Sequence, residues 1–221
     1  MKPAFLAVLL ASAAVPCAAA NIEIKGNTIR IIGTLELGDD AVFESKAQPF
    51  YQAMVVHLHS KGGMTTPALK IGRFIRQRGW DTSVEYTCYS SCAWLWLAGT
   101  RHFKTASAEI AFHSSSDVRT GAVSTASNRA VSDYLSELGY GPEVARFTTT
   151  APPNSMVLLS DHDAKRLGIQ VSIVPPTMPR QTFANVDLDK RPSLPKVSTP
   201  SFDPKLTDEI KLMAERLRQR P

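Results

Sequence analysis

The order of hydrophobic and polar residues predicts a strand pair near the start of the chain. Apolar and polar residues alternate over residues 21–37, on both sides of the neighbouring residues Gly26 and Asn27. Alternation with a period of two is typical of a strand with one buried face, and a Gly-Asn pair favours a tight turn. The segment is therefore expected to form a hairpin. Its alternating apolar residues are Ile22, Ile24, Ile29 and Ile31.

Strand and helix patterns then alternate. Residues 39–52 begin as a helix would, and residues 55–59 have the composition of a buried strand. Residues 65–78 carry apolar side chains at helical spacing and are followed by Gly79, which favours a helix end. Residues 82–86 are again expected to be a strand. This order predicts right-handed parallel βαβ units in an α/β core.

The second half of the chain continues the alternation. Residues 110–113 have the pattern of a strand that ends in a histidine, and residues 124–138 have the pattern of a helix before Gly139. Ser160 is expected to cap a helix that ends near Gly168. Residues 169–174 are expected to form the last strand of a single domain over residues 21–174.

The first twenty residues have the features of a signal peptide. Lys2 provides a positive start, residues 4–15 are apolar, and Ala18, Ala19 and Ala20 are small residues suited to cleavage. The apolar run is too short to span a bilayer. We therefore expect an exported, periplasmic or secreted protein, cleaved after Ala20, without stable membrane insertion.

Beyond the domain, the sequence predicts a linker and a terminal helix. Seven prolines fall within residues 175–204, which favours an extended linker. Residues 205–221 place apolar side chains on one face of an amphipathic helix. That face would dock on its own domain or on a neighbouring subunit, and in the second case the protein would be a homo-oligomer. A role at a membrane surface is the alternative.

Charge and motif content narrow the classes of partner. The chain has 25 Lys and Arg against 20 Asp and Glu, a formal net charge of +5 at pH 7. The basic residues are scattered and are not interleaved with aromatic ones, so nucleic acid is not an expected partner. No phosphate-binding G-x-x-x-x-G-K motif occurs, and no cofactor is expected.

Two cysteines, Cys88 and Cys92, remain after the expected cleavage. Export to an oxidising compartment favours a disulfide between them. Half of a metal site is the alternative, but no second Cys or His pair stands at zinc spacing. His57 and His59 share one face of a strand and lack a third ligand, so no metal is expected. Cys17 follows a proline, which is a poor setting for lipidation.

The candidate chemistry centres on residues 85–99, where a strand is expected to turn into a buried, Trp-containing helix. Ser90 and Ser91 stand at this turn between the two cysteines. The strand over residues 55–59 leads into Gly62 and Gly63, and a later strand ends at His113. A hydroxyl nucleophile, an imidazole base and a glycine turn with free amides are the parts that acyl transfer requires.

Three features follow one another along the chain: Ser60 with Gly62 and Gly63, Ser90 nine residues before Gly99, and His113. With this ordered set, the chain resembles the Clp-protease/crotonase-like superfamily over roughly residues 55–174. Within it, the chain is most similar to the serine peptidases, the Clp proteolytic subunit and signal peptide peptidases, and especially to uncharacterised exported proteins of this class. The resemblance implies a crotonase/Clp-protease-like fold of stacked βαβ units, followed by the Pro-rich tail and terminal helix.

The resemblance also implies roles for individual residues. Ser90 matches the nucleophile, His113 the general base, and Gly63 and the amide of Ser91 the oxyanion-hole donors. No Asp or Glu stands where the third, acidic member of the family's triad is expected. Asn154 is the residue nearby that could orient the imidazole, as an amide does in some cysteine peptidases.

Structural roles are open for the same residues, and rival functions follow from them. Ser90 and Ser91 could act only as helix caps, and His113 as a hydrogen-bonded core histidine. The first expectation is an ATP-independent serine hydrolase that acts on a peptide or protein. The second is a non-catalytic peptide-binding module on the same fold, with a vestigial site. An acyl-CoA enzyme ranks third, because export separates it from that substrate.

Overall fold

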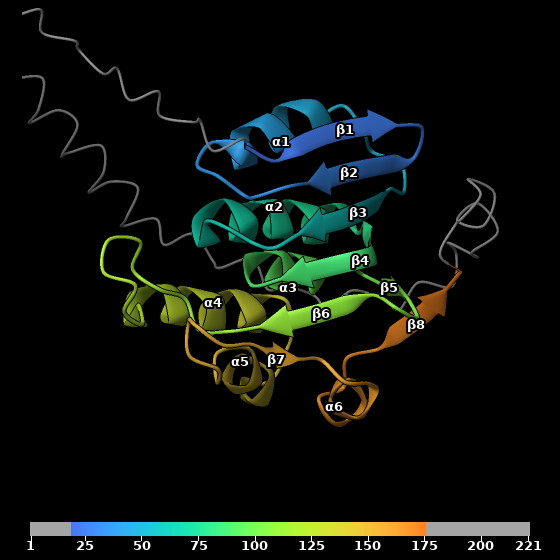
Figure 1. Cartoon of the computed structure of the whole chain (residues 1–221). Coiled ribbons are helices and arrows are strands. Elements are labelled where there is room, and N and C mark those ends of the chain that lie inside the picture. The colour runs from blue at the N-terminus through green and yellow to red at the C-terminus, as the bar shows by residue number, and fades with distance from the viewer. Residues whose placement is uncertain (1–18, 176–221) are drawn as a thin grey trace, which may run out of the picture. The chain divides into compact units, whose positions relative to one another are not determined.

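An eight-stranded mixed sheet with six helices organises residues 19–175, the part of the chain that the computed structural model describes (Figure 1). Most of the expected leader, the proline-rich linker beyond residue 175 and the terminal helix lie outside the described residues. The elements, in chain order, are β1 (Asn21–Lys25), β2 (Thr28–Ile32), α1 (Asp39–Ala47), β3 (Val55–Ser60), α2 (Thr65–Arg78), β4 (Asp81–Tyr89), α3 (Ser91–Trp96), β5 (His102–Thr105), β6 (Glu109–Phe112), α4 (Thr125–Glu137), α5 (Pro142–Thr148), β7 (Val157–Leu158), α6 (Asp161–Arg166) and β8 (Val171–Val174). The α/β class is confirmed at this level.

β1 and β2 form the expected hairpin. They pair antiparallel as far as Lys25 opposite Thr28, which leaves Gly26 and Asn27 as a two-residue turn. Gly26 has a φ of 62°, a left-handed conformation that glycine adopts without steric cost. The turn glycine therefore sets the register that directs Ile22, Ile29 and Ile31 into the core.

The parallel centre of the sheet consists of β2, β3 and β4 as successive neighbours. α1 connects the first two of these strands and α2 the next two, as the sequence predicts. Because both crossovers step in the same direction and parallel crossovers are right-handed, both helices lie on the same face of the sheet. Val56 and Leu58 of β3 and Val84 of β4 point to that face and are fully buried.

The sheet divides at β4, and this division positions the candidate site. The first half of β4 pairs with β5 through Thr82–Val84, and the second half pairs with β6 through Thr87–Tyr89. β6 therefore runs beside the end of β4. The residues that follow these two strands, Ser90 and His113, are brought to the same edge of the sheet.

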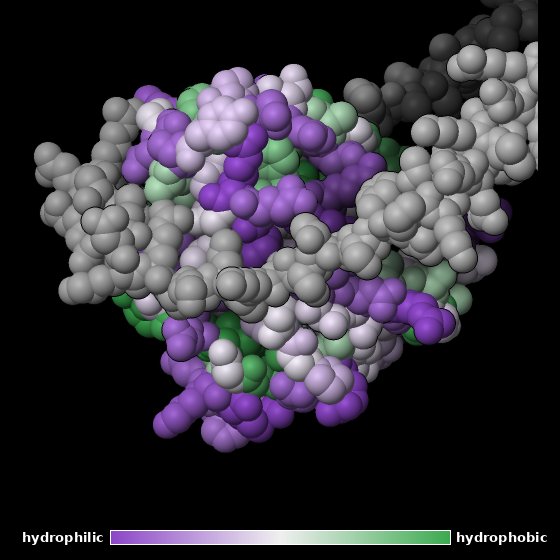
Figure 2. Space-filling model, turned by 180° about the vertical axis from the view of Figure 1, so that it is seen from behind, coloured by the Kyte–Doolittle hydropathy of each residue, from purple (hydrophilic) through white to green (hydrophobic). Residues whose placement is uncertain are grey.

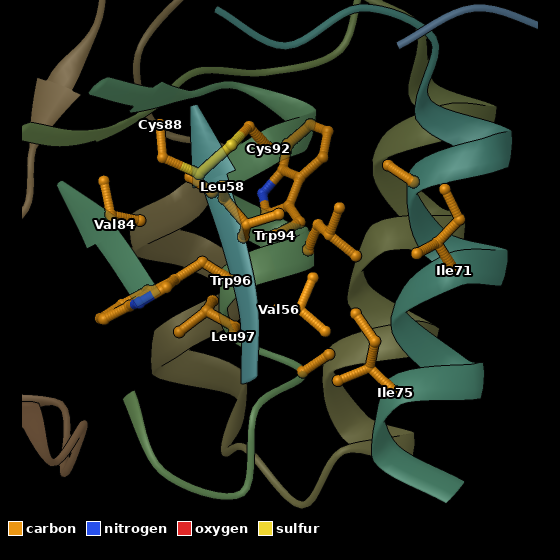
Figure 3. Packing of buried hydrophobic residues seen from close by; sticks show 14 of the residues in the cluster. Val56, Leu58, Ile71, Ile75, Val84, Cys88, Cys92, Trp94, Trp96 and Leu97 are labelled. Atoms are coloured by element: carbon orange, nitrogen blue, oxygen red, sulfur yellow. A yellow bond between two sulfur atoms is a disulfide. The ribbon is translucent and has the colours of Figure 1, made fainter. Parts of the chain in front are cut away.

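Large side chains fill the space between the sheet and the helices. In Figure 3, Ile71 and Ile75 of α2 point toward Val56 and Trp94. The three tryptophans Trp80, Trp94 and Trp96 are at most 1% exposed, as expected for the two in α3. Large aromatic side chains such as tryptophan contribute much of the apolar area that a protein core buries. α2 ends at Gly79 in the left-handed conformation, as predicted.

The surface has a mixed character. On the face shown in Figure 2, hydrophobic residues form small separate patches among hydrophilic ones. Within residues 19–175, none of the helices combines the length and the apolar character that crossing a membrane requires.

His102, at the start of β5, is a buried polar group in this core. Its Nδ1 lies 3.1 Å from the carbonyl oxygen of Gln170, and its Nε2 lies 3.1 Å from the hydroxyl of Tyr140. Nε2 also lies 3.3 Å from the carbonyl oxygen of Leu97, to which the Tyr140 hydroxyl donates at 3.0 Å. Burial lowers the pKa of His102 to about 4, because the charged ring would lose its hydration.

This burial predicts acid sensitivity of the fold. Between pH 6.5 and pH 4 the unfolded chain binds a proton at His102 that the folded chain does not, so stability falls as the pH falls through this window, by about 3 kcal/mol. His102→Gln should remove most of this slope in urea unfolding measured at several pH values. His162→Gln, at an exposed position, should leave the slope unchanged. A His102→Gln protein with the wild-type slope would contradict the assignment.

Candidate functional site

Ser90 occupies a strained turn between β4 and α3. Its φ of 55° and ψ of −127° make it the one non-glycine residue with positive φ among the described residues. A side chain in this region costs on the order of 1–3 kcal/mol and persists only where the surroundings impose it. Here the N–H of Ser90 donates to the carbonyl of Ala111 at 2.9 Å, and the carbonyl of Ser90 accepts from the N–H of Ala93 at 2.9 Å.

The expected disulfide between Cys88 and Cys92 is confirmed, and it closes over this turn. Their α-carbons are 5.2 Å apart, and both residues are fully buried. In Figure 3 the bridge lies beside Leu58 and Trp94. The bridge links the end of β4 to the first turn of α3. Ser90 lies in the middle of the short loop that the bridge closes. The bridge therefore restricts the backbone at the position that carries the strain.

Gly62 and Gly63 allow close approach between backbone segments at the end of β3. A β-carbon on Gly62 would lie 2.7 Å from the β-carbon of Ser90 and 2.8 Å from the carbonyl oxygen of Tyr89. One on Gly63 would lie 2.2 Å from the carbonyl oxygen of Leu35. These distances exclude a side chain at either position. Gly62 therefore packs against the serine turn, and Gly63 packs against the backbone of Leu35.

Two backbone N–H groups near Ser90 make no hydrogen bond to the described residues. Leu35 donates to the carbonyl of Gly62 at 2.8 Å and accepts from the N–H of Met64 at 2.7 Å. In such a parallel bridge the intervening residue, Gly63, directs its own N–H to the opposite side. Neither Gly63 N–H nor Ser91 N–H, the first of α3, has a hydrogen-bond partner among the described residues. Groups of this kind form oxyanion holes.

Ser90, His113 and Gly63 line one cavity of about 470 Å³. Hydroxyl side chains dominate the rest of its lining, together with two carboxylates, those of Glu36 and Asp117, and no Lys or Arg. The further hydroxyl residues are Thr65, Thr66, Ser115, Ser116, Ser124 and Ser127. Part of this wall is a short hairpin-like loop over residues 115–124, closed by a hydrogen bond from Ser124 N–H to Ser115 carbonyl at 2.8 Å.

The His113 imidazole is oriented by its own backbone neighbour. Its Nδ1 lies 2.8 Å from the carbonyl oxygen of Ser114. A carbonyl only accepts, so Nδ1 carries a proton, and it is the neutral ring with this tautomer whose Nε2 offers the lone pair that a general base requires. The Ser90 hydroxyl makes no hydrogen bond to either ring nitrogen within the described part of the chain. Pairing of nucleophile and base therefore stays a prediction.

Asn154 and the Ser91 side chain lie apart from these groups. Asn154 is exposed and is not among the residues that line the cavity. The Ser91 hydroxyl is fully buried and has no hydrogen-bond partner among the described residues, and Ser91 is not among the residues that line the cavity. No residue type signals the role of the Ser114 carbonyl, because every residue has a carbonyl and only the fold determines which of them meets the imidazole.

His57 and His59 lie on the sheet, outside the residues that line the cavity. His57 Nε2 is 3.7 Å from Glu85, and burial lowers the pKa of His57 despite this carboxylate. His59 stacks near Tyr86, with ring centroids 5.2 Å apart. Among residues 19–175, no cluster of three His, Cys, Asp or Glu has the geometry of a metal site.

A comparison with protein-family models finds no match to this chain, and a search of the curated proteins likewise finds none.

The contact between Gly62 and Ser90 yields a stability prediction. Gly62→Ala places a methyl group against Ser90 in addition to the cost of a left-handed alanine, so we expect a loss of about 2–4 kcal/mol in the free energy of unfolding. Gly26→Ala, which also has positive φ but no atom within 4 Å of the added carbon, should cost about 1 kcal/mol. Urea unfolding of both proteins tests this, and equal losses would show that Gly62 tolerates a side chain.

Proposed function

We propose that this chain is an exported, ATP-independent serine hydrolase of the peptidase type, with a Clp-protease/crotonase-like arrangement of its α/β core. The observation that carries the proposal is the backbone of Ser90. A serine that served only to cap α3 would need an extended backbone conformation. Ser90 instead has the strained strand-to-helix geometry that presents a nucleophilic hydroxyl in other hydrolases. Its side chain also makes no capping hydrogen bond.

In the proposed first step, the Ser90 hydroxyl oxygen attacks the carbonyl carbon of a peptide bond. Its proton passes to Nε2 of His113, directly or through one water molecule. The resulting imidazolium keeps its Nδ1–H hydrogen bond to the Ser114 carbonyl. The negative charge on the substrate oxygen accepts hydrogen bonds from the N–H groups of Gly63 and Ser91.

Collapse of the tetrahedral intermediate breaks the C–N bond, and the leaving amine takes the proton from Nε2 of His113. An acyl group then remains on Ser90. A water molecule, deprotonated by the now neutral imidazole, attacks the ester and releases the carboxylic acid while the serine regains its proton. Both halves of the reaction use the same base and the same two backbone donors.

The chemistry of the cavity favours a peptide as the substrate. A peptide backbone offers N–H and C=O groups that pair with the free side of the Gly63 segment and with the surrounding hydroxyls. The carboxylates of Glu36 and Asp117 disfavour an acidic side chain beside the scissile bond by charge repulsion. We therefore expect neutral or basic residues at this position of the substrate.

A second candidate function is a peptide-binding module without catalysis. The observation that favours it is the carbonyl of Ser114, which occupies the position where a carboxylate would stabilise an imidazolium. A neutral carbonyl supports the charged ring less strongly than a carboxylate does. In this case the same cavity holds a peptide and the Ser90 hydroxyl remains unreactive.

A fluorophosphonate probe separates the two functions. If the chain is a hydrolase, the probe should attach to Ser90 of the exported protein, and peptide mapping should locate the adduct. Ser90→Ala should abolish labelling and any peptidase activity, and His113→Gln should lower the labelling rate by about 10²-fold or more, since general base catalysis contributes on this scale.

Ser136→Ala is the matched control, because Ser136 is an exposed serine of α4 outside the cavity. Its labelling rate should equal that of the wild type. Thermal unfolding of each protein checks that loss of labelling does not follow from loss of the fold. Absence of any Ser90 adduct in a folded wild-type protein would favour the binding module.

A further inference from the structure

Asp39, the first residue of α1, is a buried carboxylate without a cationic partner. It is 3% exposed, and no Lys, Arg or His of residues 19–175 forms an ion pair with it. Its Oδ2 accepts two backbone hydrogen bonds, from Glu36 N–H at 2.8 Å and from Ala20 N–H at 3.2 Å. A buried charge is costly unless a counter-charge accompanies it.

Ala20 is firmly part of the core, whereas Ala19 is not. Ala20 is 8% exposed and belongs to the main hydrophobic cluster. Its α-carbon would lie 3.7 Å from a β-carbon on Gly33, so it packs directly over that glycine. Ala19 is exposed and makes only an isolated bridge to Thr34. Cleavage after Ala20 would remove a core residue and one of the two hydrogen bonds to Asp39.

The geometry points to a processing site between Ala19 and Ala20, at which removal of the leader creates an α-ammonium group on Ala20 that pairs with the buried carboxylate of Asp39. This bond is one residue before the one that the small-residue pattern favours. Cys17 and Ala19 would then occupy the two positions before the cleaved bond that require small residues. The inference rests on the export that the proposed function includes, but not on the proposed hydrolase activity.

The reaction is a simple hydrolysis. A leader peptidase and one water molecule break the Ala19–Ala20 amide while the exported chain is still extended. The leader then ends in the new carboxylate of Ala19, and the new amine of Ala20 takes up a proton. The amide N–H that now lies 3.2 Å from Asp39 Oδ2 becomes an ammonium N–H at the same position, so the folded structure needs no rearrangement.

The position of Asp39 at a helix N-terminus does not explain its burial. Negative side chains are stabilised there by the helix dipole, but exposed ones gain this equally. Asp40, the next residue, shows the ordinary arrangement, since its carboxylate pairs with Lys70 at 2.8 Å near the surface. The two adjacent aspartates therefore form a matched pair for experiments.

The first test is the N-terminus of the full chain after expression in exporting cells. Intact mass and N-terminal sequencing of the protein from the exported compartment should find a chain that begins at Ala20. A chain that begins at Asn21, or at any other residue, would overturn the inference. A chain that keeps residues 1–19 would do so as well.

The second test measures whether the new amine is paired. An ion pair keeps the amine protonated, so an amine-specific acylating reagent at neutral pH should modify Ala20 about tenfold or more slowly in the folded protein than in urea. Asp39→Asn should remove this protection, and Asp40→Asn should retain it. If Asp39→Asn does not fold, the comparison of folded and urea-unfolded wild type still decides. Equal rates in these two states would overturn the pairing.

Discussion

The left-handed backbone at Ser90 is the constraint on which the rest of the site depends. A non-glycine residue does not hold this conformation by itself. Three neighbours impose it: the strand β6, which accepts its N–H at Ala111; the disulfide that ties Cys88 to Cys92 around it; and Gly62, whose missing side chain makes room for it. The division of the sheet at β4 matters for the same reason, because it brings β6, and with it His113, to the end of that strand.

Neutral peptide groups surround the proposed reacting atoms, while the carboxylates of Glu36 and Asp117 line the rest of the cavity. Peptide dipoles serve both ends of the proposed reaction, with two N–H groups for the oxyanion and the Ser114 carbonyl for the imidazole. A fixed dipole orients the ring and selects its tautomer without adding a buried charge. It also stabilises an imidazolium less than a carboxylate does, so the proposed hydrolase would react more slowly than one with a carboxylate at this position.

Much of the fold could be predicted because its signals are local. The Gly26-Asn27 turn, the helix end at Gly79 and the cap at Ser160 all lie where the pattern places them. Strands β5 and β7 and helix α5 were missed, since two to seven residues carry too little periodicity to stand out. At the site, residue types predicted that Ser90, Gly63 and His113 would line one cavity. The Ser114 carbonyl, the clash that Gly62 avoids and the exposed place of Asn154 depend on tertiary geometry that no residue type encodes.

The segment between β2 and α1 connects the buried aspartate to the proposed oxyanion hole. Asp39 accepts the N–H of Glu36, and the adjacent Leu35 brackets Gly63 through two backbone hydrogen bonds. These two hydrogen bonds, one on each side of Gly63, hold it beside Leu35, and Gly62 before it packs against the serine turn. The place of the Gly63 N–H is therefore set by a segment that ends at Asp39. If removal of the leader creates an ammonium group that pairs with Asp39, this ion pair would stabilise the same short segment that holds one of the two proposed oxyanion donors.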